Sequence, residues 1–280
     1  MHLLTWIILF TALGGALSAL AASVFLVVSE RTRARVLPHL VSFATGALLS
    51  AALLGLLPHS IESAGIENAH TIGMTLLAGL LVFFVLEKMV LWRHCHQDVC
   101  EVHVHGPHDH VDAHPGHAHN HGHLLTFEAQ RDKASAMLIL IGDGFHNILD
   151  GLLIAAAFLT DVHLGIVTAI AVCAHEIPQE VGDLAILLNG GMSRIRALTL
   201  NVIASLTSVV GGVAAYFAMA QVTHVLPYAI ALAASSFLYI AVADLIPGLH
   251  RKVDPGSGAW QFAYIVLGVA VIYVSHSLAH

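Results

Sequence analysis

Long uncharged apolar runs are the feature that most constrains the fold of this chain. A helix needs about 20 residues to cross about 30 Å of hydrocarbon. Eight apolar runs are expected to form such helices, at residues 3–29, 37–58, 71–91, 134–159, 164–189, 197–220, 226–248 and 259–277. The composition agrees, because 57% of the residues are hydrophobic and 10% are charged, against roughly 25% charged in soluble domains. The sequence therefore predicts an all-α polytopic membrane protein with one membrane domain.

The basic residues predict the orientation of these helices. All 11 of them fall in or beside odd-numbered connections between the expected spans: Arg31, Arg33, Arg35, Lys88, Arg93, Arg131, Lys133, Arg194, Arg196, Arg251 and Lys252. Basic connections stay on the cytoplasmic side of a membrane, so we expect both termini outside the cytoplasm. The first run is expected to be a retained helix and not a signal peptide, since no basic stretch precedes it.

One connection, residues 92–133, is long and rich in histidine. We expect it to be a disordered cytoplasmic loop between the helices of residues 1–91 and those of 134–280. Neutral imidazole binds zinc and similar ions, so the loop is expected to attract metal as a buffer, sensor or concentrator, and a merely solvated linker is the alternative. Its candidate ligands are His94, Cys95, His96, His103, His105, His108, His110, His114, His117, His119, His121 and His123.

Polar residues interrupt the fourth and fifth apolar runs. They are Asp143, His146, Asn147 and Asp150 in the fourth, and His175, Glu176, Gln179, Glu180 and Asp183 in the fifth. Helical spacing places each set on one face of its helix. Carboxylates at membrane depth are costly, and neither run contains a Lys or Arg to neutralise them. A bound metal ion, protons or both are therefore expected to supply the positive charge.

The types of side chain indicate which cations suit this site. Imidazole, carboxylate and amide oxygen together favour Zn²⁺, Fe²⁺, Mn²⁺ or Cd²⁺ over Ca²⁺ and Mg²⁺. Pro178 adds a second indication, because a proline inside a helix removes the hydrogen bond to the carbonyl of Ala174 and kinks the helix. Kinked helices at the midplane form ion sites in many transporters. A packing kink in a polar seam is the alternative, and it leaves the acids unexplained.

HNILDG and HEIPQEVGD, the central motifs of these two runs, resemble the paired motifs HNxxDG and HExPHExGD of one branch of the ZIP family of divalent-metal transporters. LVFFVLEKMV at 81–90 and SFLYIAVADLIPGL at 236–249 resemble the third and seventh helices of that branch. The resemblance covers nearly the whole chain. It implies a 3+2+3 arrangement of the helices, a metal site between the fourth and fifth, and alternating-access movement of metal into the cytoplasm.

When the residues of the family motifs are matched by position, the resemblance implies a set of metal ligands: His146, Asn147, Asp150, His175, Glu176 and Gln179, with Glu180 close by. Asp143 and Asp183 flank them as outer-shell or pathway residues. Gln179 departs from the pattern, since the branch has a second His there and an amide oxygen is a weak ligand. Ala51 and Gly55 stand where the branch often has Asp and His, which leaves His59 as either the contribution of the second helix or an interfacial residue.

The expected function is uptake of Zn²⁺ through the cell membrane, taken to be a bacterial inner membrane. The expected partners are the metal ion and the lipid bilayer, with no cofactor and no nucleic acid, and both a monomer and a homodimer stay open. A metal exporter is one alternative, although exporters of the cation-diffusion type usually have six spans. An intramembrane zinc metalloprotease is the other, but Gln179 and Pro178 break the HExxH motif that it needs.

Overall fold

The structure is a computed structural model that describes residues 2–95, 121–189, 191–219, 222–250 and 257–277. These residues form helices and turns, with no strand among them. The α-helices are α1 (Leu3–Val27), α2 (Glu30–Ser50), α3 (Leu57–Ala64), α4 (Ala69–Cys95), α5 (His121–Thr160), α6 (Val162–Asn189), α7 (Arg194–Ser205), α8 (Thr207–Met219), α9 (Leu226–Tyr239), α10 (Ile246–His250) and α11 (Ser257–Ser277). Two π-helical segments, η1 (Ala51–Leu56) and η4 (Ile240–Leu245), and two 3-10 turns, η2 (Ile66–Asn68) and η3 (Thr223–Val225), connect them.

The prediction of eight membrane spans is confirmed. The segments of the described chain that are long and apolar enough to cross a membrane are Leu3–Val24, Arg35–Ala64, Ile66–Leu86, Leu140–Thr160, Val162–Leu188, Arg194–Met219, Leu226–His250 and Gly258–Ser277. The second span is longer than predicted, because Pro58 falls in the first turn of α3, where a missing N–H is tolerated. The helix therefore continues past the proline to Ala64.

The His-rich connection differs from the prediction at both ends. Because α4 continues to Cys95 and α5 begins at His121, helix covers parts of 92–133 that the sequence predicts to be disordered. Residues 124–137 read LLTFEAQRDKASAM, which are mainly strong helix formers and account for the earlier start of α5. The expected metal ligands from His96 to His119 lie outside the described residues, and metal binding by this loop stays a prediction.

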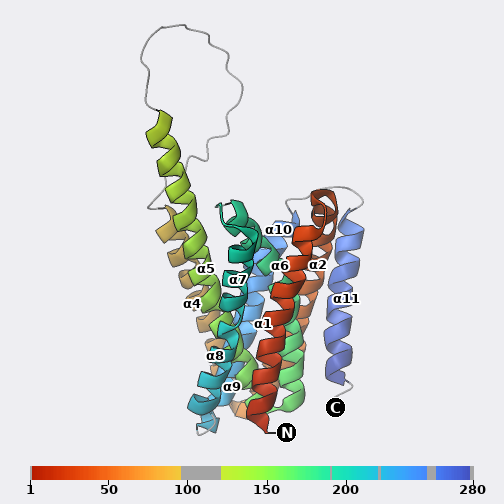
Figure 1. Cartoon of the computed structure of the whole chain (residues 1–280). Coiled ribbons are helices and arrows are strands. Elements are labelled where there is room, and N and C mark those ends of the chain that lie inside the picture. The colour runs from red at the N-terminus through yellow and green to blue at the C-terminus, as the bar shows by residue number, and fades with distance from the viewer. Residues whose placement is uncertain (1, 96–120, 190, 220–221, 251–256, 278–280) are drawn as a thin grey trace.

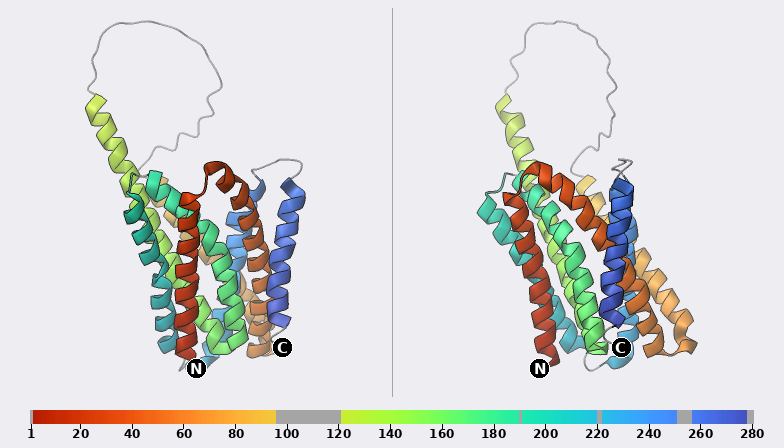
Figure 2. Two further views of the ribbon diagram at one scale, coloured as in Figure 1. Left: turned by 45° about the vertical axis from the view of Figure 1, so that its right-hand side comes forward. Right: turned by 90° about the vertical axis from the view of Figure 1, so that its right-hand side faces the viewer.

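The two ends of the bundle differ in charge. Figures 1 and 2 show the starts of α2 and α7 and the last turn of α4 at one end, and the first turn of α1 and the last turn of α11 at the other. The first, here called the basic end, carries the described residues Arg31, Arg35, Lys88, Arg194 and Arg196. The second, here called the terminal end, carries no Lys or Arg among the described residues. That the basic end faces the cytoplasm stays a prediction from this charge pattern.

Glycines let α5 and α8 pack backbone against backbone. A Cβ at Gly151 of α5 would overlap the carbonyl oxygen of Ser208 in α8. A Cβ at Gly211 of α8 would overlap the carbonyl oxygen of Ile148 in α5. Small residues allow such close approach in lipid, where helix association depends on packing. This contact fixes the helix that carries His146 and Asp150.

The second and seventh spans share a local irregularity. Each contains a π-helical segment, η1 or η4, and each has a proline two residues beyond it, Pro58 or Pro247. η1 packs against α9 of the seventh span, and η4 packs against α2 of the second. If a two-fold axis related the first three spans to the last three, each π-helical segment would contact the equivalent helix of the other half in this way. It agrees with the 3+2+3 arrangement, which stays a prediction.

Gly211→Ala should destabilise the protein, because the new methyl group meets backbone that cannot move aside. Overpacking of this kind costs about 1–3 kcal/mol. Gly73→Ala in α4 is the matched control, since a Cβ there meets no atom within 4 Å. Thermal denaturation of the purified protein in detergent should show a lower midpoint for Gly211→Ala alone. Equal midpoints for the two variants would contradict the close packing of α5 and α8.

Candidate metal centre

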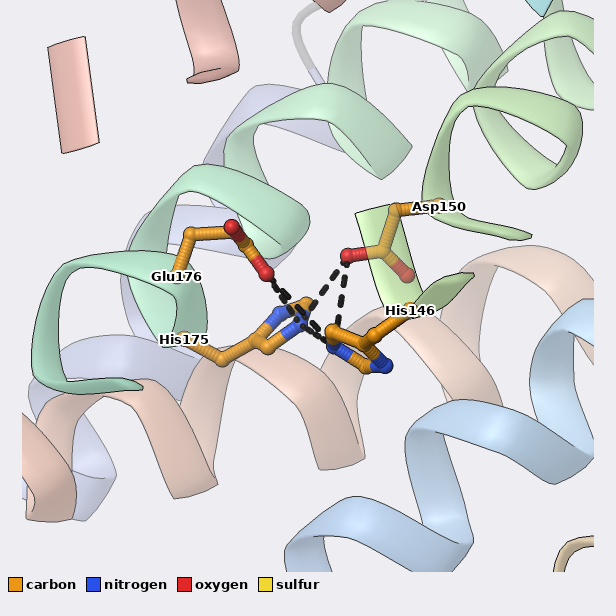
Figure 3. A group of neighbouring side chains, drawn as sticks. All are labelled: His146, Asp150, His175 and Glu176. Atoms are coloured by element: carbon orange, nitrogen blue, oxygen red, sulfur yellow. Dashed lines mark hydrogen bonds and ion pairs between the residues drawn. The ribbon is translucent and has the colours of Figure 1, made fainter. Parts of the chain in front are cut away.

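Four side chains of α5 and α6 meet inside the bundle (Figure 3): His146, Asp150, His175 and Glu176. One ligand atom from each lies within 4.8 Å of the other three. His146 and Asp150 are one turn apart on α5, and His175 and Glu176 are neighbours near the middle of their span on α6. All four are predicted ligands, and they are called the four-ligand cluster below.

The distances within the four-ligand cluster match those around a tetrahedral zinc ion. His146 Nε2 lies 3.3 Å from His175 Nε2, 3.5 Å from Glu176 Oε1 and 3.7 Å from Asp150 Oδ2. His175 Nε2 lies 3.2 Å from Asp150 Oδ2 and 3.6 Å from Glu176 Oε1. Zinc binds such atoms at about 2.0–2.2 Å, and tetrahedral ligands at that radius stand about 3.3–3.6 Å apart. These five distances are therefore close to the spacing of ligand atoms around one ion, and the two carboxylate oxygens lie within 4.8 Å of each other.

The carboxylates of the four-ligand cluster are buried, and their ion-pair partners among the described residues are the two imidazoles, with no Lys or Arg. Asp150, His175 and Glu176 are each 1% exposed, and His146 is 24% exposed. Both oxygens of Asp150 and both of Glu176 accept no hydrogen bond from the described residues. Buried carboxylates of this kind are costly unless a cation neutralises them. The arrangement therefore fits a bound divalent ion, with the two imidazoles as its nitrogen ligands.

The backbone orients His175 for metal binding. Its Nδ1 lies 3.2 Å from the carbonyl oxygen of Ala171, one turn earlier in α6. Because a carbonyl can only accept, Nδ1 is assigned the proton, and Nε2 keeps the lone pair that a metal requires. The ring of Phe237 in α9 packs edge-on against the same imidazole, with 6.2 Å between the ring centroids. These two contacts hold Nε2 toward the four-ligand cluster.

No described contact joins the other three predicted ligands to the four-ligand cluster. Asn147 Nδ2 donates to Asp143, at 2.9 Å to Oδ1 and 3.2 Å to the carbonyl oxygen. Glu180 lies one turn beyond Glu176, where it accepts a hydrogen bond from Ser205 of α7. Gln179 is half-buried. Direct metal binding by Asn147, Gln179 and Glu180 stays a prediction.

The two sides of the four-ligand cluster have opposite character. Toward the basic end, α5 and α6 place the carboxylates of Asp143, Glu180 and Asp183. Toward the terminal end they place apolar side chains that are at most 2% exposed and belong to one core: Leu153, Ile154, Phe158, Leu164 and Val167. These five residues are called the apolar seal below. The four-ligand cluster is thus closed toward the terminal end and flanked by carboxylates on the other side.

A cavity of about 300 Å³ lies at the terminal end, beyond the apolar seal. It is lined by Gly55, Pro58, His59, Glu62 and His276. A Cβ at Gly55 would touch Leu164 and Val167, so this part of the cavity borders the apolar seal. His59 is a predicted pathway residue, whereas Glu62 and His276 were not predicted from the sequence. They come from the second and eighth spans, and no motif in the sequence links those spans.

The sequence profile of the ZIP zinc transporters matches residues 2–276. The chain belongs to the ZIP family. Zinc transporter zipt-7.1 of Caenorhabditis briggsae is 31% identical over 283 residues, which cover 89% of this chain and 71% of the relative. Zinc transporter ZIP13 of Homo sapiens is 31% identical over 268 residues, or 84% and 70% of the two chains. Zinc transporter ZIP10 of Danio rerio is 41% identical over 145 residues, or 49% and 17%.

Family membership confirms the resemblance seen in the two motifs. ZIP proteins are transporters and not enzymes, which removes the intramembrane protease from the alternatives. Gln179 also argues against a protease, because it stands where a zinc protease of the HExxH type needs its second histidine. The chain is accordingly a multi-pass membrane protein whose substrate is a divalent metal ion.

Loss of His175 should abolish tetrahedral metal binding at the four-ligand cluster. Cobalt(II) is a suitable probe, because four-coordinate cobalt absorbs visible light far more strongly than the six-coordinate ion. His175→Ala should weaken cobalt binding by more than about 100-fold, since even the loss of an outer-shell partner costs about 10–100-fold. His70→Ala, which removes an exposed histidine of α4, is the control and should titrate like the unchanged protein. An unaltered tetrahedral spectrum in His175→Ala would contradict the assignment.

Proposed function

We propose that this chain carries Zn²⁺ into the cytoplasm by alternating access, with the four-ligand cluster as the transport site. The observation that carries the proposal is the cluster itself, two imidazoles and two carboxylates whose ligand atoms lie within 4.8 Å of one another in the middle of two membrane spans. The relatives are named as zinc transporters, which favours Zn²⁺ as the substrate. Fe²⁺, Mn²⁺ and Cd²⁺ accept the same types of ligand, and the weak amide of Gln179 is the residue expected to shift the preference among them.

The proposed route runs from the terminal end to the basic end. The ion first meets His59 and Glu62 in the cavity, where imidazole and carboxylate can replace part of its water shell. The apolar seal then has to part before the ion can reach the four-ligand cluster. From there Asp143 and Asp183 lead toward the basic end. In this scheme the structure represents the state closed to the outside, and metal binding shifts the population between the two states.

Protons are proposed to replace the metal when it leaves. An emptied cluster holds two buried carboxylates without a cation, which is unfavourable at membrane depth. Proton uptake by Asp150 or Glu176 removes this charge, and metal binding releases the proton again. The four-ligand cluster therefore alternates between a metal-bound and a protonated form.

The direction, the membrane and the assembly are part of this proposal. Inward movement rests on the basic end facing the cytoplasm, and an exporter with the same site would move the ion the opposite way. Location in a bacterial inner membrane and association into a homodimer are further proposals, and the relatives named above are animal proteins.

Zinc flux into proteoliposomes tests the proposal. The protein should move Zn²⁺ from the terminal end to the basic end, and His175→Ala should reduce the flux to that of protein-free liposomes. His70→Ala should keep the full rate, because His70 lies outside the four-ligand cluster and the cavity. Flux in the opposite direction would indicate the exporter. Undiminished flux in His175→Ala would rule out the four-ligand cluster as the transport site.

A further inference from the structure

The basic end of the bundle carries a group of exposed arginines close to the end of α1. Arg31 and Arg35 lie one turn apart in the first turns of α2, and Arg194 and Arg196 lie in the first turn of α7. All four side chains are exposed. Figure 2 shows the starts of α2 and α7 close to the last turn of α1. These four residues are called the arginine patch below.

A shared apolar cluster holds the two halves of the arginine patch together. It contains Ala22 of α1 and Ala197 of α7, and Leu37 of α2 packs against it. Arg35 is two residues from Leu37, and Arg196 directly precedes Ala197. Arginine extends a long apolar stem and keeps its charged group at the surface. The two pairs of guanidinium groups are therefore mounted on one core at the basic end.

The arginine patch lacks a counter-charge among the described residues. None of its guanidinium groups makes an ion pair with a side chain that the structure describes. Residues 28–37 contain three arginines against the single acid Glu30, and residues 190–197 contain two arginines and no acid. The planar guanidinium of arginine binds phosphate through two parallel hydrogen bonds. The patch is therefore suited to an anion that carries phosphate.

The arginine patch lies at the boundary of the membrane. The second membrane span begins at Arg35, and the sixth begins at Arg194. The two most exposed large apolar side chains of the described chain lie at the same level: Val27 at the end of α1 is 88% exposed, and Ile195 beside Arg194 is 81% exposed. Basic and apolar side chains that are exposed together are typical of contact with the headgroup and acyl boundary of a bilayer.

We infer that the arginine patch binds the headgroup of an anionic phospholipid, whose acyl chains lie beside Val27 and Ile195. Anionic lipids attract basic residues at the membrane surface, and each Lys or Arg contributes about fivefold to the affinity. A free phosphate ion or an acidic protein would leave the two apolar side chains in water. The lipid would anchor the start of α7, whose last residue, Ser205, donates a hydrogen bond to Glu180 of α6. It would thereby stabilise a helix that packs against the metal-binding helix α6.

Native mass spectrometry of the purified full-length protein tests this lipid site, because the method counts bound lipids one by one. Phosphatidylglycerol should bind more tightly than phosphatidylcholine with the same acyl chains. Arg35→Gln and Arg194→Gln should each weaken phosphatidylglycerol binding about fivefold and leave phosphatidylcholine binding unchanged. Lys88→Gln is the matched control and should bind like the unchanged protein. It also removes one positive charge from the basic end, but from α4, which packs against α3 and α9.

Two further measurements separate the lipid from a less specific effect. Inorganic phosphate at millimolar concentration should not displace phosphatidylglycerol, because it offers no acyl chain to the apolar side chains. Without lipid, the thermal denaturation midpoints of Arg35→Gln and Arg194→Gln should equal that of the unchanged protein. Added phosphatidylglycerol should raise the midpoint of the unchanged protein most, since a ligand stabilises the state that binds it.

Three results would overturn the lipid site. Equal affinity for the two lipids would leave the arginine patch to an acidic protein partner. Displacement by inorganic phosphate would make it a site for a free anion. A loss of affinity in Lys88→Gln as large as that in Arg194→Gln would show attraction by the basic end as a whole.

Discussion

Asp150 and Glu176 place two carboxylates in the middle of membrane spans, where one Asp at a helix centre costs about 2.5–3.5 kcal/mol. The two spans that carry them contain no Lys or Arg, and among the described residues their ion-pair partners are the imidazoles of His146 and His175. A cation that comes and goes is the neutralising partner consistent with this arrangement. Much of the surrounding structure can be understood as holding four ligands ready for an ion while keeping lipid and bulk water away.

The helix packing serves this requirement in two ways. Close contact through Gly151 and Gly211 fixes α5 against α8, and the carbonyl of Ala171 together with Phe237 fixes the ring of His175. The apolar seal then isolates the four-ligand cluster from the cavity at the terminal end. On the opposite side the interior stays polar, with carboxylates on both α5 and α6. A site that is rigid in itself, sealed on one side and polar on the other, suits a carrier that exposes it to one face at a time.

The sequence predicts the spans and the four-ligand cluster because both depend on local patterns. Apolar run length determines the spans, and the one-turn spacing of His146 and Asp150 determines which side chains share a face. The second span is longer than predicted, since hydropathy does not show that Pro58 falls in the first turn of a new helix. Contacts between distant helices were also missed. The contact of Ser205 with Glu180, and the cavity that His276 shares with His59, depend on how α7 and α11 dock, which no motif in the sequence records.

The most direct test of the central claim is to locate zinc in the protein by anomalous X-ray scattering at the zinc edge. The account predicts one strong peak about 2.0–2.2 Å from His146 Nε2, His175 Nε2 and one oxygen each of Asp150 and Glu176. Zinc bound elsewhere in crystals of the full-length protein, with no peak between α5 and α6, would contradict it.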